Sequence, residues 1–207
     1  MSRGSLNGNQ RAGTRRRQNK VILVIGDGES EKVYFERLSD ICGPVTIKSV
    51  TAKVNGIKKI IKKTESIAKQ YDISPDRGDI IAIVMDLDFR YRLEDIMEME
   101  EECVSKGFGL FISNPCLEVW LLSHFRPLTH PYDQKEILAD LEKQLGKQYS
   151  KSSGIVIDDM MVDRAIKNAE KLLPESDCNP AGCFQRNPST MIHLLVKLIR
   201  NMTCNKS

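Results

Sequence analysis

Acidic side chains come directly after two apolar, strand-like runs of this chain. One acidic group follows residues 21–25 and the other follows residues 80–85; together they comprise Asp27, Glu29, Glu31, Asp86 and Asp88. Because ligands of open parallel sheets bind beyond the carboxyl ends of the strands, we expect the two groups to lie at one edge. Carboxylate oxygens, waters and substrate phosphates are the ligands that Mg²⁺ prefers. The pattern therefore predicts a site for a divalent cation.

The spacing within each group fits a shared site. Asp86 and Asp88 point to the same side if the chain is still extended there, and Leu87 then faces the core. Asp27 and Glu31 lie one helical turn apart, so they can share a face. An ordinary interpretation stays open, because Asp is common at strand ends and Glu in a first helical turn complements the helix dipole.

Two further segments carry side chains that could approach this edge. Glu118 lies amid apolar residues one turn after Asn114, and it either turns toward the strand ends or is exposed. Lys147 and Lys151 flank Tyr149 in a basic segment, which either meets phosphate or is simply solvated.

The first 20 residues are basic and hold no acidic residue. Glycine and polar residues interrupt them, so we expect a disordered tail. Such a tail either grips phosphates or only aids solubility. Its most concentrated basic run is Arg15, Arg16 and Arg17.

Other phosphate chemistries fit less well. The run from Gly26 to Glu31 resembles the start of a dinucleotide fingerprint, but Glu31 replaces the third glycine and its charge would repel a pyrophosphate. No Gly-x-x-x-x-Gly-Lys-Ser/Thr loop is present, which argues against ATP hydrolysis by this chain alone. A small phosphatase using Asp86 and Asp88 stays open, although such a pair usually follows the first strand.

Strand-like and helical patterns alternate along the first part of the chain. This alternation predicts an α/β, Rossmann-like core with a mainly parallel sheet over residues 21–125. The later patterns are helical and predict a C-terminal extension, 126–207, packed on that core; Asn114-Pro115 and Asn187-Pro188 each look like a helix start. The expected strands are 21–25, 45–50, 80–85 and 110–112, and the expected helices 29–38, 56–71, 93–106, 114–125, 134–145, 159–173 and 188–202.

Composition limits the class of protein. Hydrophobic residues make up 41% and charged residues 29% of the chain, as in ordinary globular proteins. No apolar run approaches the roughly 20 residues of a membrane span, and no apolar signal core follows the basic N-terminus. We therefore expect a cytoplasmic protein with no membrane partner.

In their order along the chain, several segments resemble the RloB family, which is related to the AbiLii abortive-infection toxins. The resemblance covers about residues 20–202, and its most specific piece begins at Ser113. The segments are Val24-Ile25-Gly26-Asp27-Gly28-Glu29-Ser30-Glu31 with Tyr34-Phe35, Val84-Met85-Asp86-Leu87-Asp88-Phe89, Ser113-Asn114-Pro115-Cys116-Leu117-Glu118-Val119-Trp120-Leu121-Leu122, Tyr149, Lys151, and Asn187-Pro188-Ser189-Thr190.

The resemblance implies a Toprim-type fold, shared with topoisomerases, primases and overcoming-lysogenization-defect nucleases. In that fold an acid after the first strand and an Asp-x-Asp pair after the third hold magnesium. These positions are Asp27, Asp86 and Asp88 here, with Mg²⁺ or Mn²⁺ as the implied metal. Family members usually carry Glu where this chain has Asp27, and this departure favours a non-catalytic subunit.

The function implied is metal-dependent cleavage of nucleic acid, DNA or RNA and possibly tRNA, by the toxic effector of an anti-phage defence system. In that function Glu31 or Glu118 orients water or completes a second metal site, and Lys151 stabilises charge on the phosphate. A partner ATPase is expected, because family members are often encoded beside one. The alternative is a regulatory subunit that binds the ATPase and does no chemistry, and self-association stays open.

Overall fold

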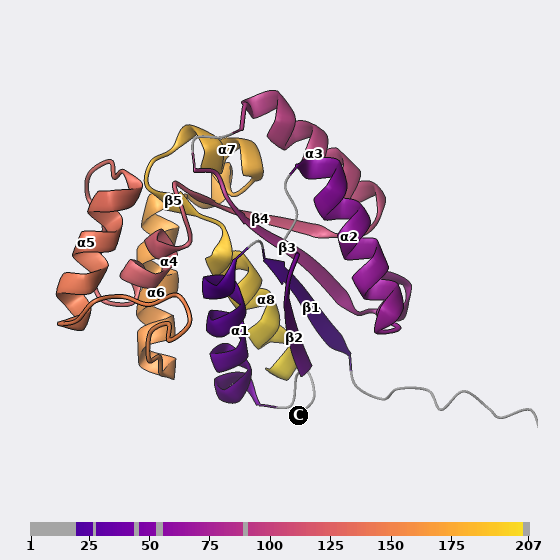
Figure 1. Ribbon diagram of the computed structural model, residues 1–207, viewed down its shortest axis with the longest axis horizontal. Helices are drawn as coiled ribbons and strands as arrows, with labels where there is room; N and C mark the ends of the chain where they lie inside the picture. Colours follow the sequence, from indigo (N-terminus) through magenta and orange to yellow (C-terminus); the bar gives the residue numbers. More distant parts are fainter. Residues whose placement is uncertain (1–19, 27, 44–45, 53–55, 89–90, 205–207) are drawn as a thin grey trace, which may run out of the picture.

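The computed structural model describes residues 20–26, 28–43, 46–52, 56–88 and 91–204, and Figure 1 shows their arrangement. A five-stranded sheet in the order β2-β1-β3-β4-β5 forms the centre. The first four strands are parallel and β5 is antiparallel to β4, so the prediction of an α/β fold with a mainly parallel sheet is confirmed. The strands are β1 (Val21–Gly26), β2 (Thr46–Thr51), β3 (Ile80–Asp86), β4 (Gly109–Asn114) and β5 (Ser189–Thr190).

Helices cover both faces of the sheet (Figure 1). None of them, within the described ranges, has the length and apolar character needed to cross a membrane. They are α1 (Glu29–Cys42), α2 (Ile57–Gln70), α3 (Leu93–Ser105), α4 (Glu118–Ser123), α5 (Gln134–Leu145), α6 (Asp159–Leu172), α7 (Pro180–Gln185) and α8 (Ile192–Cys204), with the short turns η1 (Pro75–Arg77) and η2 (Glu175–Asp177).

The unbroken apolar runs of β1 and β3 arise because both strands are buried on both faces. Successive side chains of a strand point to opposite faces. Leu23 and Ile25 therefore pack in the layer that contains α2, α3 and α7. Ile22 and Val24 pack in the layer that contains α1, α4, α6 and α8. This burial fixes the strands firmly, so the residues that follow their carboxyl ends have a rigid base.

The C-terminal part contributes directly to the sheet. The prediction that a helix begins at Asn187-Pro188 is wrong, because Ser189 and Thr190 form β5 and α8 begins only at Ile192. The Ser113 and Thr190 hydroxyls lie 2.8 Å apart across the β4–β5 pair. This contact between residues 77 positions apart has no local sequence signal.

Neither Asn-Pro segment starts a helix. The asparagine of each one forms hydrogen bonds to backbone groups of a distant segment. α4 begins at Glu118, so the helix start predicted at Asn114-Pro115 is wrong. The amide of Asn114 instead donates to the carbonyls of Phe184 (3.0 Å) and Arg186 (2.9 Å). The amide of Asn187 accepts from the N–H of Tyr132 (3.1 Å) and donates to the carbonyl of the same residue (2.8 Å). Both side chains thereby fix the chain around the end of β4.

A buried histidine makes the stability of this fold depend on pH. His124 is fully buried, its Nδ1 lies 3.0 Å from the carbonyl of Trp120, and its Nε2 lies 3.4 Å from the hydroxyl of Tyr34. Burial lowers the pKa of His124 to about 4, so the ring is neutral in the folded chain. The unfolded chain, with a pKa of about 6.5, binds the proton first as the pH falls.

We therefore expect the free energy of unfolding to fall by roughly 3 kcal/mol between about pH 6.5 and pH 4. Urea unfolding followed by circular dichroism at several pH values measures this change. His124→Gln should flatten the pH dependence, while His130→Gln, at an exposed histidine, should keep the wild-type slope. Equal slopes in all three proteins would contradict this role of His124.

Candidate functional site

Three acidic side chains from different elements meet at the carboxyl edge of the sheet. β1 and β3 are neighbours, so α1, which follows β1, starts beside the end of β3. Glu31 lies in the first turn of α1, Asp86 is the last residue of β3, and Glu118 is the first residue of α4. Glu31 and Glu118 are only 2% and 4% exposed. Glutamates are rarely buried so fully without a partner or a function.

Two glycines leave room for Glu31. A Cβ atom at Gly26 would lie 2.7 Å from the Cβ of Glu31, and one at Gly28 would lie 2.9 Å from its Oε2. Side chains at either position would therefore displace the carboxylate. The Gly-x-Gly pattern resembles the start of a dinucleotide fingerprint. In this structure, the two glycines leave space for the side chain of Glu31 at the start of α1.

Asp86 is held by the residue that precedes α4. Its Oδ1 accepts a hydrogen bond of 2.7 Å from the backbone N–H of Leu117, the residue before Glu118. This bond ties the end of β3 to the first turn of α4. It therefore fixes Asp86 and Glu118 relative to each other.

Asp88 does not continue the extended strand. Its φ is +44°, a left-handed conformation that Asp tolerates better than most residues. Its N–H donates to the carbonyl of Pro115 (2.9 Å), and its Oδ1 accepts from the amide of Gln134 (3.1 Å). The condition for a parallel Asp86/Asp88 pair, an extended chain, is therefore not met. Leu87 between them is nevertheless buried in the core.

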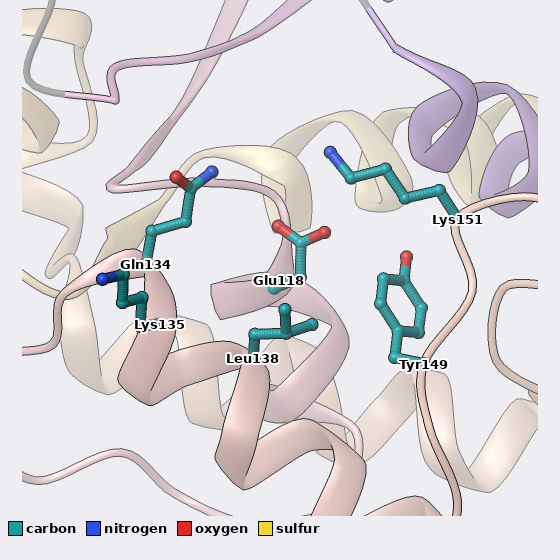
Figure 2. Close-up of a pocket in the computed structure, with 6 residues that line it drawn as sticks. All are labelled: Glu118, Gln134, Lys135, Leu138, Tyr149 and Lys151. Atoms are coloured by element: carbon teal, nitrogen blue, oxygen red, sulfur yellow. The ribbon is translucent and has the colours of Figure 1, made fainter.

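Lys151 lies beside the three acids, on the loop between α5 and α6. Partial burial lowers the pKa of Lys151, but the charges of Glu118, Asp86 and Glu31 raise it more, so the net shift is upward. Its ammonium group points toward the carboxylate of Glu118 in Figure 2. We call Glu31, Asp86, Glu118 and Lys151 the carboxyl-edge site.

The loop that carries Lys151 is fixed to α1. Arg37 of α1 donates to the carbonyls of Ser153 and Ile155. The hydroxyl of Tyr149 donates to Oγ of Ser30 at 3.1 Å. Burial, followed by the charges of Glu118 and Glu31, raises the pKa of Tyr149, while the bond to Ser30 lowers it in part; its phenol is neutral. These contacts place residues 149–155 over the first turns of α1.

A pocket of about 260 Å³ adjoins the carboxyl-edge site. Figure 2 shows the Glu118 carboxylate between Gln134 and Lys151, with Leu138 and Tyr149 beneath it. Gln134 is the first residue of α5. Its position is fixed because Asp133 caps this helix and accepts hydrogen bonds from the N–H groups of Lys135 (2.7 Å) and Glu136 (2.8 Å). We call it the α5 pocket; its lining residues are Glu118, Gln134, Lys135, Leu138, Tyr149 and Lys151.

The remaining candidate residues are distributed as follows. Asp27 and the Arg15–Arg17 run lie outside the described residues. Lys147 is exposed on the same loop as Lys151 but does not line the α5 pocket. Sequence reasoning missed Gln134, Lys135 and Leu138, because nothing local distinguishes them from an ordinary first turn and exposed face of a helix.

The acids at this edge fit only an open kind of metal site. Among the described residues, which exclude Asp27, no group of three or more His, Cys, Asp or Glu side chains could hold a metal ion. Mg²⁺ often takes only one or two carboxylates and completes its octahedron with waters and substrate phosphates. Asp86 and its acidic neighbours offer hard oxygen donors of that kind. They do not form a closed, all-protein cage.

Comparison with known proteins gives a family and no structural relative. A family model described as "RloB-like protein" matches residues 22–199, which is most of the chain. No curated protein and no solved structure matches the chain.

Proposed function

The chain belongs to the family of RloB-like proteins, and from its carboxyl-edge site we propose that it is a metal-dependent nuclease. The observation that carries the proposal is the convergence of Glu31, Asp86 and Glu118 on Lys151. The acids come from three separate elements, and two of them are almost completely buried. A fold gains no stability from gathering like charges, so such a cluster favours a functional role.

The proposed role of Asp27 follows from the resemblance alone, and those of the other groups follow from the resemblance together with their positions at the carboxyl edge. Asp86 and Asp88, with Asp27, would hold Mg²⁺ or Mn²⁺. When bound, the ion supplies a Lewis acid for the phosphate and lowers the pKa of a coordinated water. Glu31 and Glu118 orient the attacking water, and Lys151 stabilises the charge that develops on the phosphate oxygens.

Nucleic acid suits this site better than a small phosphate ester. Lys135 and Lys151 line the same pocket and Lys147 is exposed on the loop of Lys151, so these cations can attract the phosphates of a polynucleotide. The resemblance to Toprim-type nucleases points the same way. It also suggests DNA or RNA, including tRNA, as the substrate and a role as the toxic effector of an anti-phage defence system, controlled by a partner ATPase.

Two observations favour a second candidate, a regulatory subunit without catalytic activity. Asp88 is turned to Gln134, and no ready-made group of three metal ligands exists in the described part of the chain. Such a subunit would dock on an ATPase, and Asp27→Glu would leave its behaviour unchanged. In a nuclease, the same change should alter the cleavage rate.

The experiment that separates the two candidates is induced expression in cells. We expect the wild-type chain to stop growth and to fragment tRNA, other RNA or DNA on gels, while Asp86→Ala/Asp88→Ala does neither at equal protein levels. Toxicity with intact nucleic acids, or fragments that persist in the double variant, would refute the nuclease. Generic phosphomonoester turnover without fragments would indicate a phosphatase.

A further inference from the structure

We propose that the α5 pocket binds one unpaired nucleobase of a single-stranded polynucleotide, next to the phosphate that is cut. This inference rests on the proposed nuclease function and specifies its substrate. It uses residues that have no part in the cleavage step, above all Gln134, Lys135 and Leu138.

The lining of the pocket suits a flat ring with a polar edge. Leu138 and the ring of Tyr149 supply apolar surface on which a base can stack. The Gln134 amide carries both donors and an acceptor, and Lys135 adds a donor, so the polar edge of a base finds partners. An alkyl chain would leave these polar groups without complementary partners.

The pocket is physically joined to the cleavage site. Glu118 and Lys151 line the pocket and also belong to the carboxyl-edge site. Gln134 bonds Asp88 at 3.1 Å, so a group bound at Gln134 lies beside the acidic edge. A base in the pocket therefore places its own phosphate group near Lys151.

The size of the pocket limits what enters. Its volume of about 260 Å³ lies just below the roughly 300 Å³ at which pockets for drug-sized ligands begin. One base fits such a space, and a base that stays stacked inside a duplex cannot enter it. In a duplex the base would first have to leave its stack, which has a free-energy cost. Single strands, loops and overhangs should therefore be preferred.

The test measures binding of the full-length chain to labelled oligonucleotides by fluorescence anisotropy, with Ca²⁺ in place of Mg²⁺ so that the probes stay intact. The probes are an RNA and a DNA single strand of about 12 nucleotides, their duplexes, and an abasic strand of equal length and charge. A free nucleoside monophosphate is added as a competitor. Cleavage in Mg²⁺ is scored separately on the same probes.

We expect the abasic strand and the duplexes to bind at least about fivefold more weakly than the intact single strands. Leu138→Glu, which replaces apolar stacking surface with a charge, should remove the difference between intact and abasic strands. Leu198→Glu is the matched control, because Leu198 of α8 is 39% exposed and Leu138 is 36% exposed. This control should retain the difference, and both variants should keep the wild-type circular dichroism spectrum.

Equal binding of intact and abasic strands by the wild-type chain would overturn the base pocket. So would a loss of discrimination in Leu198→Glu equal to that in Leu138→Glu. Displacement by the free monophosphate at the affinity of the strand would assign the pocket to small nucleotides and refute the polynucleotide. Base-dependent binding without any cleavage would instead contradict the nuclease and leave the pocket standing.

Discussion

Asp86→Asn will lower the rate of nucleic-acid cleavage by at least about a thousandfold. Asp86 ends β3 at the meeting point of the acidic side chains, and its Oδ1 accepts the N–H of Leu117. Asn keeps an oxygen that can accept this bond, so the local fold is retained. It removes the negative charge that a hard divalent cation requires. Single-turnover cleavage of a labelled strand in Mg²⁺ measures the effect.

Asp79→Asn is the control for this substitution. Asp79 is a buried aspartate directly before β3, at the opposite edge of the sheet from Asp86. Its carboxylate accepts from the N–H groups of Val21 (2.9 Å) and Ser74 (3.0 Å). We expect this variant to lose about 1–3 kcal/mol of stability while each folded molecule cleaves at the wild-type rate. Equal cleavage losses in both variants would mean that Asp86 acts only through the fold.

Lys151→Met will lower the cleavage rate by about a hundredfold, because it removes the cation that faces the reacting phosphate. The methionine keeps an unbranched apolar side chain, so packing on the loop changes little. Lys151→Arg should recover part of the rate, because it restores the charge with a different geometry. Rapid-quench assays at saturating substrate separate this loss from weaker binding.

Lys147→Met is the control on the same loop. Lys147 is exposed and lies outside the α5 pocket, so its loss should weaken binding slightly without slowing the cleavage step. Two outcomes would contradict the role given to Lys151. One is an unchanged rate in Lys151→Met, and the other is an equal loss of rate in both variants.

The parallel part of the fold could be predicted from the sequence because its signals are local. The runs at 21–25 and 80–85 are apolar throughout, as strands buried on both faces must be. β5 could not be predicted from the sequence, because it has only two residues and is defined by its pairing with β4. The two Asn-Pro segments were misread as helix starts for a related reason. The partners of Asn114 lie about 70 residues away, and those of Asn187 lie 55 residues away.

The candidate site was predictable in part. Asp86 and Glu31 follow neighbouring strands, so the rule for open sheets places them at one edge. The sequence leaves the direction of the Glu118 side chain open, and in the structure this side chain is buried and lies beside Lys151. The α5 pocket could not be foreseen, because it forms where α4, α5 and the loop around Tyr149 meet. The spacing of these residues along the sequence does not predict that the three segments come together.

Manganese binding to the purified chain tests the central claim most directly, because it requires neither a partner ATPase nor knowledge of the substrate. Mn²⁺ can be titrated by electron paramagnetic resonance, with and without a single-stranded oligonucleotide. We predict about one or two bound ions per wild-type chain, tighter binding with the oligonucleotide, and at least about tenfold weaker binding in Asp86→Asn. A chain that binds no Mn²⁺ in the millimolar range, or binds it equally well after Asp86→Asn, would contradict a metal-dependent site at this edge.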